Sequence, residues 1–220
     1  MIITIDGPAG TGKTTIARRL AEKLAYNYFD TGAMYRALTH LVIKNQIDIY
    51  DAKALSIFLA DFHLDIKDVA GQKHYYVDGE DVTDVIRTQE VTQKVSEISA
   101  NGAIRNAIVE IQRGFGKNNN AVFEGRDMGT VVFPKAEYKI FLTARPTVRA
   151  ERRYLELKEK NTQAPVQEQD ILKELMARDH SDSTREISPL KEAAGALLID
   201  TSDLSIDQVV EQILGHVSKK

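Results

Sequence analysis

Hydrophobic and polar residues alternate in two different patterns along this chain. Short apolar runs at residues 2–5, 121–123 and 197–199 are typical of buried strands. In residues 14–24, apolar side chains recur every three or four positions, which predicts a helix with one buried face. Because strands and helices alternate in this way, we expect an α/β fold of three layers, with helices on both faces of a mostly parallel central sheet.

The same patterns predict the other elements. Two further strands are expected at residues 26–30 and 138–143. Helices are expected at about residues 33–44, 51–59 with Asp51 as the cap, 89–100, 103–115, 146–160 and 167–178, with a last one that Ser205 caps. A polar break is expected at residues 161–165, and a charged loop with the sequence RDHSDSTREISPL at residues 178–190.

Residues 48–83 break the alternation of strands and helices. Within them, residues 62–66 and 73–77 alternate between apolar and polar side chains, and the linker between these two runs contains Ala70 and Gly71. Asp78 and Gly79 then form a strong turn dipeptide. The segment is interpreted as a small antiparallel insertion outside the main sheet.

The composition narrows the possible chemistry. A chain of 220 residues that is 43% hydrophobic can build one substantial core. It has no cysteine, which excludes disulfides and thiolate zinc sites, and its five histidines show no metal-binding spacing. A net charge of −3 disfavours nucleic acid as a partner. The chain enters a strand directly and has no apolar run near the roughly 18 residues of a membrane span, so we expect a soluble cytoplasmic protein.

The motif GPAGTGKT at residues 7–14 follows the first strand and opens the first helix. Glycines let the backbone approach an anion closely, so that successive N–H groups and a helix N-terminus converge on phosphate oxygens. Lys13 adds a charge at the outer phosphates, and the Thr14 hydroxyl is suited to Mg²⁺. The motif predicts a nucleoside triphosphate site made of Gly7, Pro8, Ala9, Gly10, Thr11, Gly12, Lys13, Thr14 and Thr15.

Phosphoryl transfer requires cations that neutralise the transferred group more than it requires bases. The chain supplies such cations near turns and strand ends, at Lys13, Arg36, Arg126, Arg149, Arg153, Arg178 and Arg185. An arginine on a helix is as often a solvated side chain as a functional one, so this pattern alone leaves both readings open.

Five stretches resemble those of bacterial cytidylate kinases, which transfer the γ-phosphoryl group of ATP to CMP or dCMP. They are IDGPAGTGKTT at residues 5–15, DTGAMYR at 30–36, DGEDVTDVIRTQEV at 78–91, EGRDMGTVVFP at 124–134 and RDHSDSTREISPL at 178–190. DTGAMYR and GRDMGTVVFP are far more specific than the phosphate loop. The resemblance covers nearly the whole chain and implies a P-loop kinase that uses ATP and Mg²⁺.

The resemblance also implies roles for individual residues. The cytosine is expected to face Thr31, Arg105 and Asp127, the CMP phosphate Arg36, Arg126 and Arg185, and the ribose Ser96, Arg178 and Asp182. The residues expected to act in catalysis are Lys13, Arg126, Arg178 and Asp182. Arg149 and Arg153 are expected to close over the ATP phosphates, although Arg152 lies beside them.

Four of these residues have simpler explanations that the sequence leaves open. Asp127 resembles a turn carboxylate satisfied by backbone N–H groups. Arg178 and Asp182 are spaced as a surface ion pair, and Ser96 as an ordinary helix-surface serine. Glu124 could orient Mg²⁺ through water or hold a neighbouring cation.

The expected organisation is one P-loop kinase domain. Its core is expected at about residues 1–47, 101–144 and 179–220, an NMP-binding insertion at 48–100 and a helical lid at 145–178. The chain is expected to act as a monomer. The rival functions are a kinase for UMP, AMP or another small acceptor, a GTP switch, which would need an N-K-x-D signature that this sequence lacks, and an ATP-binding module without catalysis.

Overall fold

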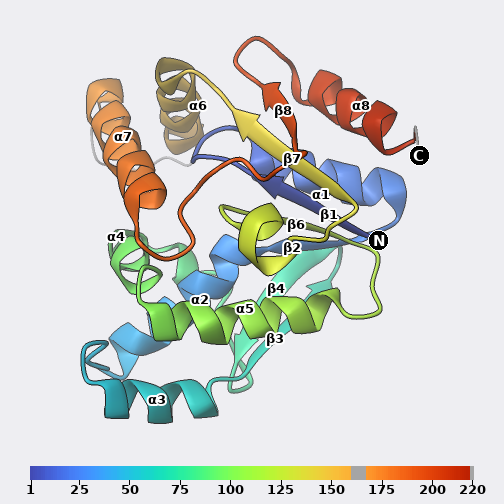
Figure 1. Ribbon diagram of the computed structural model, residues 1–220. Helices are drawn as coiled ribbons and strands as arrows, with labels where there is room; N and C mark the ends of the chain where they lie inside the picture. Colours follow the sequence, from blue (N-terminus) through green and yellow to red (C-terminus); the bar gives the residue numbers. More distant parts are fainter. Residues whose placement is uncertain (160–166, 219–220) are drawn as a thin grey trace. The chain divides into compact units, whose positions relative to one another are not determined.

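The structure, a computed structural model, describes residues 1–159 and 167–218. The chain divides into two compact units, which are described separately: unit 1 comprises Met1–Phe29 and Asn118–Lys220, and unit 2 comprises Asp30–Lys117. The elements of unit 1 are β1 (Ile2–Asp6), α1 (Lys13–Leu24), β2 (Asn27–Asp30), β6 (Ala121–Gly125), η2 (Met128–Val132), β7 (Tyr138–Thr143), α6 (Pro146–Glu159), α7 (Glu168–Thr184), β8 (Leu197–Asp200) and α8 (Ile206–Val217). Figure 1 shows them along the chain.

A five-stranded sheet of order β2-β6-β1-β7-β8 forms the centre of unit 1. The pairings of β1 with β6, of β1 with β7 and of β7 with β8 are all parallel. The carboxyl ends of these strands therefore lie at one edge of the sheet, where open α/β sheets bind their ligands. The predicted mostly parallel α/β fold is confirmed.

Apolar side chains bury both faces of this sheet. On one face, α1 and α8 lie side by side, and Ile16, Leu20 and Ile213 pack on the strands with no solvent exposure (Figure 1). The other face carries a row of aromatic rings, in which Phe123 stacks on Phe29 with centroids 4.7 Å apart and contacts Phe133 at 4.6 Å. Because β1 and β6 are covered on both faces, their ends are held firmly in place.

Unit 2 consists of helices around a small antiparallel sheet. Its elements are α2 (Thr31–Lys44), α3 (Ala52–Asp61), β3 (Leu64–Val69), β4 (Gln72–Val77), β5 (Glu80–Asp81), η1 (Val85–Arg87), α4 (Gln89–Ile98) and α5 (Gly102–Gly116). The strands pair in the order β3-β4-β5 and are antiparallel. The predicted antiparallel insertion is therefore present, and Asp78 and Gly79, both with positive φ, make its second turn.

The predicted helix caps are also confirmed. The Asp51 carboxylate accepts hydrogen bonds from the N–H groups of Lys53 and Ala54. At the start of α2, where no cap was named above, the Asp30 carboxylate accepts a hydrogen bond from the N–H group of Ala33. Ser205 forms a full capping box with Gln208 at the start of α8. Three short elements were not predicted, the strand β5, the 3₁₀ turn η1 and the π-helical turn η2. The predicted break at residues 161–165 lies outside the described residues.

The prediction of a charged loop from residue 178 onward is wrong in its first part, because α7 continues to Thr184. The apolar side chains of the buried stripe end at Leu175, but Asp182 continues the same stripe and is only 7% exposed. An ion pair rather than an apolar contact holds this last turn of the helix in place. The hydroxyls of Ser183 and Thr184 also donate to carbonyls one turn earlier, which occupies the polar side chains without ending the helix.

Candidate functional site

The glycine-rich loop, residues 7–14, connects β1 to α1 in a conformation that requires glycine. Gly7 has φ of +149°, and a Cβ at this position would lie 2.1 Å from the carbonyl oxygen of Leu142 on β7. Gly10 has φ of +78°, and a Cβ there would lie 3.0 Å from the Cβ of Arg149 on α6. The loop is therefore packed between two neighbouring elements, and only its glycines permit that approach.

Lys13 occupies the first position of α1 and is almost fully buried. Its Nζ donates a 2.6 Å hydrogen bond to the carbonyl oxygen of Pro8, which also accepts from the Thr11 hydroxyl at 3.1 Å. Burial and, to a smaller extent, the charge of Arg126 lower the pKa of Lys13 to about 7. A bound anion with several negative oxygens would raise the pKa of Lys13 again and favour its protonated form, because few negative charges of the protein itself lie near this side chain.

A second support for the loop comes from the end of β8. The buried Thr201 hydroxyl donates to the carbonyl oxygen of Thr11 at 3.1 Å and accepts from Arg152 at 3.1 Å. Arg152 also donates to the carbonyl oxygen of Thr201 at 2.6 Å. Both hydrogen bonds of Arg152 thus hold Thr201 in place, and Thr201 in turn binds the loop.

At the end of β6, next to β1 in the sheet, three charged side chains form a cluster, here called the Arg–Asp cluster: Arg126, Asp182 and Arg185. Arg126 donates to the Asp182 carboxylate at 2.8 Å, and Arg185 lies 3.8 Å from its other oxygen. Burial alone would raise the pKa of Asp182, but the charges of Arg126, Arg178 and Arg185 outweigh it and hold the pKa below its usual value. The cluster carries more positive than negative charge, as an anion site requires.

This arrangement decides between two readings of Asp182. The sequence left open a solvent-exposed ion pair between Arg178 and Asp182 on the helix surface. Asp182 is instead buried, and its hydrogen-bond partner is Arg126, 56 residues away in the sequence. Arg178 lies half-buried on the same helix, and its charge acts on both Lys13 and Asp182.

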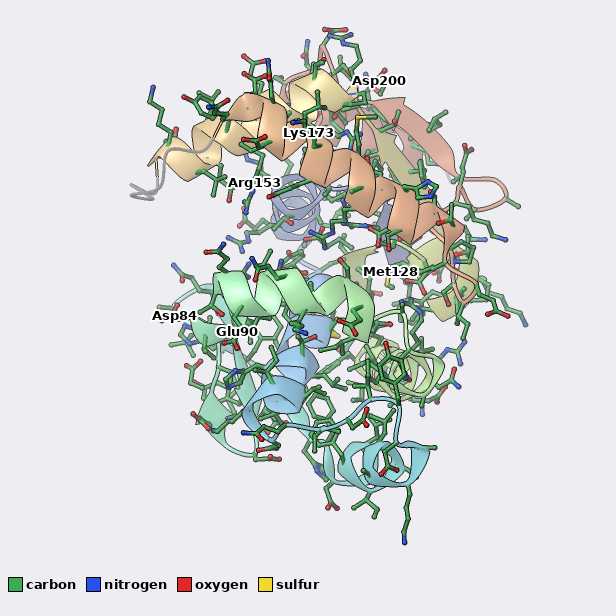
Figure 2. All side chains as sticks on the ribbon, turned by 90° about the vertical axis from the view of Figure 1, so that its left-hand side faces the viewer. Asp84, Glu90, Met128, Arg153, Lys173 and Asp200 are labelled. Atoms are coloured by element: carbon green, nitrogen blue, oxygen red, sulfur yellow. The ribbon has the colours of Figure 1, made fainter. Side chains whose placement is uncertain are left out.

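Asp127 follows Arg126 directly and is 2% exposed. The simple explanation for Asp127 was a turn carboxylate bound to the N–H groups that follow it. Those N–H groups, of Met128 and Gly129, donate instead to the carboxylate of Asp6 at 2.9 and 2.8 Å (Figure 2 labels Met128). The carboxylate of Asp6 therefore binds the first two N–H groups of the turn that follows Asp127.

The three arginines of α6 have different environments. Arg149 is buried and donates to the backbone carbonyl of Ala9 in the loop at 3.1 Å. Arg152 holds Thr201. Arg153 is exposed and pairs with Glu156 at 2.7 Å, one turn further along the helix (Figure 2). Of the three, Arg149 is the one whose guanidinium group contacts the glycine-rich loop.

Four predicted site residues lie in unit 2. Thr31 is buried at the start of α2. Arg36 on α2 donates to the carbonyl oxygen of Ile86 at 3.2 Å and to the Thr92 hydroxyl at 2.8 Å. Arg105 on α5 is 2% exposed and donates to the carbonyl oxygen of Ser99 at 2.9 Å. Ser96 is half-buried on α4, and nothing in its surroundings decides between its two readings.

Two arginines of unit 2 are oriented by neighbouring aromatic and polar groups. The Arg105 guanidinium lies over the Tyr35 ring, 5.2 Å from its centroid. Such stacking fixes the plane of a guanidinium group while leaving its edge able to donate hydrogen bonds. The two contacts of Arg36 fix its side chain between η1 and α4.

No group of three or more acidic, histidine or cysteine side chains among the described residues could hold a metal ion. Mg²⁺ commonly keeps several waters and binds through few protein ligands together with substrate phosphates. The Thr14 hydroxyl, an oxygen ligand in the first turn of α1, fits that pattern. Glu124 is buried and accepts a hydrogen bond from the Tyr28 hydroxyl at 2.8 Å, so it is at least partly a structural group.

Comparison with known sequences gives a consistent answer. The family model described as cytidylate kinase matches residues 3–219. The chain is 55% identical to the cytidylate kinase of Protochlamydia amoebophila, over 98% of this chain and 96% of that protein. It is 44% identical to the cytidylate kinase of Lactobacillus gasseri, over 100% of this chain and 95% of that protein. The chain belongs to the cytidylate kinase family.

The resemblance predicted from the motifs is therefore confirmed, and so is the prediction that this member of the cytidylate kinase family is an enzyme. Among solved structures, a gluconokinase from Sinorhizobium meliloti aligns with a TM-score of 0.51 at 13% identity, over 99% of this chain and 91% of that chain. At this identity the likeness supports the fold alone. Among the described residues, no helix has the length and apolar character to cross a membrane.

Sequence reasoning missed three residues that the structure connects to the site of this cytidylate kinase. Asp6 lies between the predicted strand at residues 2–5 and the glycine-rich loop, and it was given no role. Thr201 and Asp179 lie far from the loop in the sequence, and their contacts with Arg152 and Arg149 could not be inferred from spacing. Of these, only Asp6 had a signal, since a charged residue at the end of a buried strand is unusual.

Proposed function

We propose that this protein transfers the γ-phosphoryl group of ATP to CMP or dCMP, giving CDP or dCDP and ADP. One observation carries the proposal: within unit 1, the glycine-rich loop and the Arg–Asp cluster follow adjacent parallel strands, β1 and β6. Two anion sites at neighbouring strand ends are what a reaction between two phosphates needs, because it depends mainly on their alignment.

The glycine-rich loop would hold ATP. Its backbone N–H groups and the N-terminus of α1 would bind the phosphates of ATP, and Thr15 would add a hydroxyl in the first turn. Lys13 would move from the Pro8 carbonyl to the outer phosphates, where its charge offsets the charge that develops during transfer. The Thr14 hydroxyl would bind Mg²⁺, which neutralises the phosphate oxygens.

The nucleoside monophosphate would be bound by side chains. Arg126 and Arg185, together with Arg36, would bind the phosphate of CMP, since a guanidinium group donates two parallel hydrogen bonds to an oxyanion. Asp182, Arg178 and Ser96 would bind the ribose. Asp182 already orients Arg126, so one carboxylate would serve both the sugar and the arginine.

Cytosine would be recognised by Thr31, Arg105 and Asp127. A carboxylate accepts a hydrogen bond from the N4 amino group of cytosine, whereas uracil presents an O4 acceptor at the same place. Facing Asp127, uracil would leave two acceptors opposed, which is costly in a buried site. The proposal therefore includes a preference for CMP over UMP.

The reaction would need no general base, because the attacking phosphate of CMP is already anionic near neutral pH. Arg126 and Lys13 would neutralise the transferring group, and Arg149, with Arg153 in a closed state, would cover the ATP phosphates. Residues 145–178 would act as a lid and residues 48–100 as the CMP-binding insertion, with the core at about 1–47, 101–144 and 179–220. Closure would exclude the water that otherwise competes as acceptor.

The proposal extends to where and how the protein works. It would act as a monomer on small-molecule substrates, in the cytoplasm where ATP is abundant, and without nucleic acid or membrane as a partner. Its net charge of −3 supports a small-molecule acceptor over a polynucleotide.

An acceptor comparison tests this proposal. Purified protein with Mg²⁺ and ATP is given CMP, dCMP, UMP or AMP in turn, and ADP formation is followed by a coupled assay. We expect the highest kcat/KM with CMP or dCMP. A higher value with UMP or AMP would contradict the assignment of Asp127, and ATP binding without transfer to any of the four would favour a non-catalytic ATP-binding module.

A further inference from the structure

We propose that Asp179 is a positioning residue for the phosphoryl donor, which acts by fixing the guanidinium group of Arg149 against the glycine-rich loop. This inference rests on the proposed function, because it assigns a role within the ATP site. Asp179 lies within the stretch at residues 178–190, but it is not among the predicted site residues. Its role follows from the contacts of Arg149.

Arg149 is bound by acceptors from three different segments. Its Nε donates to the carbonyl oxygen of Ala144 at 3.1 Å, at the start of α6. Its Nη1 donates to the carbonyl oxygen of Ala9 in the loop at 3.1 Å and to the Asp179 carboxylate on α7 at 2.6 Å. The side chain is 5% exposed, so these contacts leave it little freedom.

The Cα and Cβ of Arg149 are also held in place, as its guanidinium group is. A Cβ on Gly10 would lie 3.0 Å from the Cβ of Arg149 and 3.4 Å from its Cα, so the backbone of α6 lies directly on the loop. With Cα fixed by this packing, the position of the guanidinium group depends on what holds its nitrogens. Asp179 is the charged partner among them, and a charge-assisted hydrogen bond is the stronger kind.

The second oxygen of Asp179 supports a role beyond structure. Oδ1 is buried and accepts no hydrogen bond from any described residue. A buried carboxylate oxygen without a donor is costly, which is unexpected at a purely structural ion pair. It provides an acceptor for a second N–H of Arg149, so the guanidinium group can release Ala9, donate to a phosphate oxygen and remain bound to Asp179.

Helix α7 thus presents two carboxylates one turn apart, each bound to an arginine from another segment. Asp182 binds Arg126 at 2.8 Å, on the side of the Arg–Asp cluster. Asp179 binds Arg149 at 2.6 Å, on the side of the glycine-rich loop. Helices α6 and α7 lie side by side (Figure 1), and this ion pair joins them at the loop. We infer that α7 sets the distance between the donor and acceptor arginines.

Steady-state kinetics of Asp179→Asn test the inference. The substitution keeps the shape of the side chain but removes its charge, so Arg149 loses its fixed position. We expect KM for ATP to rise about 10- to 100-fold, in line with the cost of misplacing a group in the site, while KM for CMP changes less than about 3-fold. Asp170→Asn is the matched control, since this exposed aspartate on the same helix pairs with Lys173, 3.5 Å away.

Two further variants separate positioning from stability. Asp179→Glu keeps the charge and is expected to recover most of the affinity for ATP. Arg149→Lys removes the group on which Asp179 acts, so adding Asp179→Asn to it should raise KM for ATP little further. Thermal unfolding of each variant shows which are folded, and if Asp179→Asn is unfolded, the Asp179→Glu and Arg149→Lys values decide.

The outcomes distinguish this inference from the proposed function. If the wild-type protein makes no CDP, the proposed function is wrong. If it makes CDP and Asp179→Asn has wild-type KM values, or raises both KM values equally, Asp179 is not a positioning residue for the donor. Additive effects of Arg149→Lys and Asp179→Asn would also overturn the inference.

Discussion

The glycine-rich loop and the Arg–Asp cluster are the two proposed anion sites of unit 1, but they are built from different parts of the chain. The loop is eight consecutive residues that offer main-chain N–H groups, and its shape is fixed by glycines packed against β7 and α6. The Arg–Asp cluster offers side chains that come from the end of β6 and from α7 and the residue after it. The first site is therefore local in sequence and the second is not.

This difference bears on how each site tolerates change. A main-chain site depends on the backbone conformation, so it fails when a side chain is added where none fits. A side-chain site depends on charges that hold each other, so it fails when one charge is removed and its partner stays buried. The predictions below test this contrast in order of expected size.

The largest effect is expected for the removal of a charge that contacts the transferring group. Lys13→Ala and Arg126→Ala should each lower kcat by about 10³- to 10⁵-fold, as cations at a phosphoryl group do in other kinases and GTPases. Both variants should keep their circular dichroism spectrum and bind at least one nucleotide.

Arg19→Ala is the control for these two variants. Arg19 lies on α1, about half exposed, and pairs with Asp207 on α8. Its removal should leave kcat within about 2-fold, since exposed ion pairs contribute little. If kcat decreases by less than about 10-fold in Lys13→Ala and Arg126→Ala, the assigned roles are contradicted.

The next effect concerns the loop. Gly7→Ala places a Cβ 2.1 Å from the Leu142 carbonyl oxygen, so the backbone must shift, and the free energy of unfolding should fall by about 3 kcal/mol or more. Gly71→Ala is the control, because Gly71 also has positive φ but no atom within 4 Å of a Cβ. It should cost only about 1 kcal/mol of conformational strain.

Chemical denaturation measures both losses. If the two glycine variants lose the same stability, strain at positive φ explains both, and the close packing of the loop against β7 contributes nothing.

A third effect is a pH dependence of stability caused by Asp6, which precedes the loop and binds the turn after Arg126. The pKa of Asp6 is raised from 3.8 to about 6, mainly by burial, which outweighs the N–H groups of Gly129 and Met128 and the charge of Lys13, and the charge of Asp127 contributes to the rise. Between these two pH values the folded state binds more protons than the unfolded state, so the contribution of Asp6 to stability falls as pH rises. The fall is of the order of 3 kcal/mol.

Asp6→Asn removes this titration. The free energy of unfolding of the wild type minus that of the variant should decrease from about pH 4 to about pH 6 and stay level above it. The offset between the two proteins reflects the loss of one acceptor for Met128 or Gly129, so the slope is the quantity to measure. A level difference across the whole range would show that the pKa of Asp6 is not raised.

The smallest effect is expected at the exposed face of α6. Arg153 is 42% exposed and pairs with Glu156, so Arg153→Ala should change stability by less than about 0.5 kcal/mol. Its effect on KM for ATP should be smaller than that of Arg149→Ala, because Arg149 already contacts the loop. A larger effect at Arg153 would show that the outer arginine is the one that reaches the phosphates.

The same contrast explains what the sequence could predict. The place of the loop between β1 and α1 was predicted correctly, because eight adjacent residues form its motif. The Arg–Asp cluster was predicted only through the family resemblance, since 56 residues separate Arg126 from Asp182. The prediction that the helix ends near residue 178 was wrong, because the buried residue in the last turn of α7 is a paired aspartate rather than an apolar side chain. Asp6, Asp179 and Thr201 act through contacts that no spacing rule contains.

The central claim is that the loop delivers a phosphoryl group to an acceptor held by the Arg–Asp cluster. The most direct test uses ATP labelled at the γ-phosphate, with Mg²⁺, CMP and the purified protein, and follows the label by chromatography. The account predicts that the label appears in CDP with the wild type and is nearly absent from CDP with Lys13→Ala and Arg126→Ala. Label that appears only in inorganic phosphate, or remains in ATP, would contradict it.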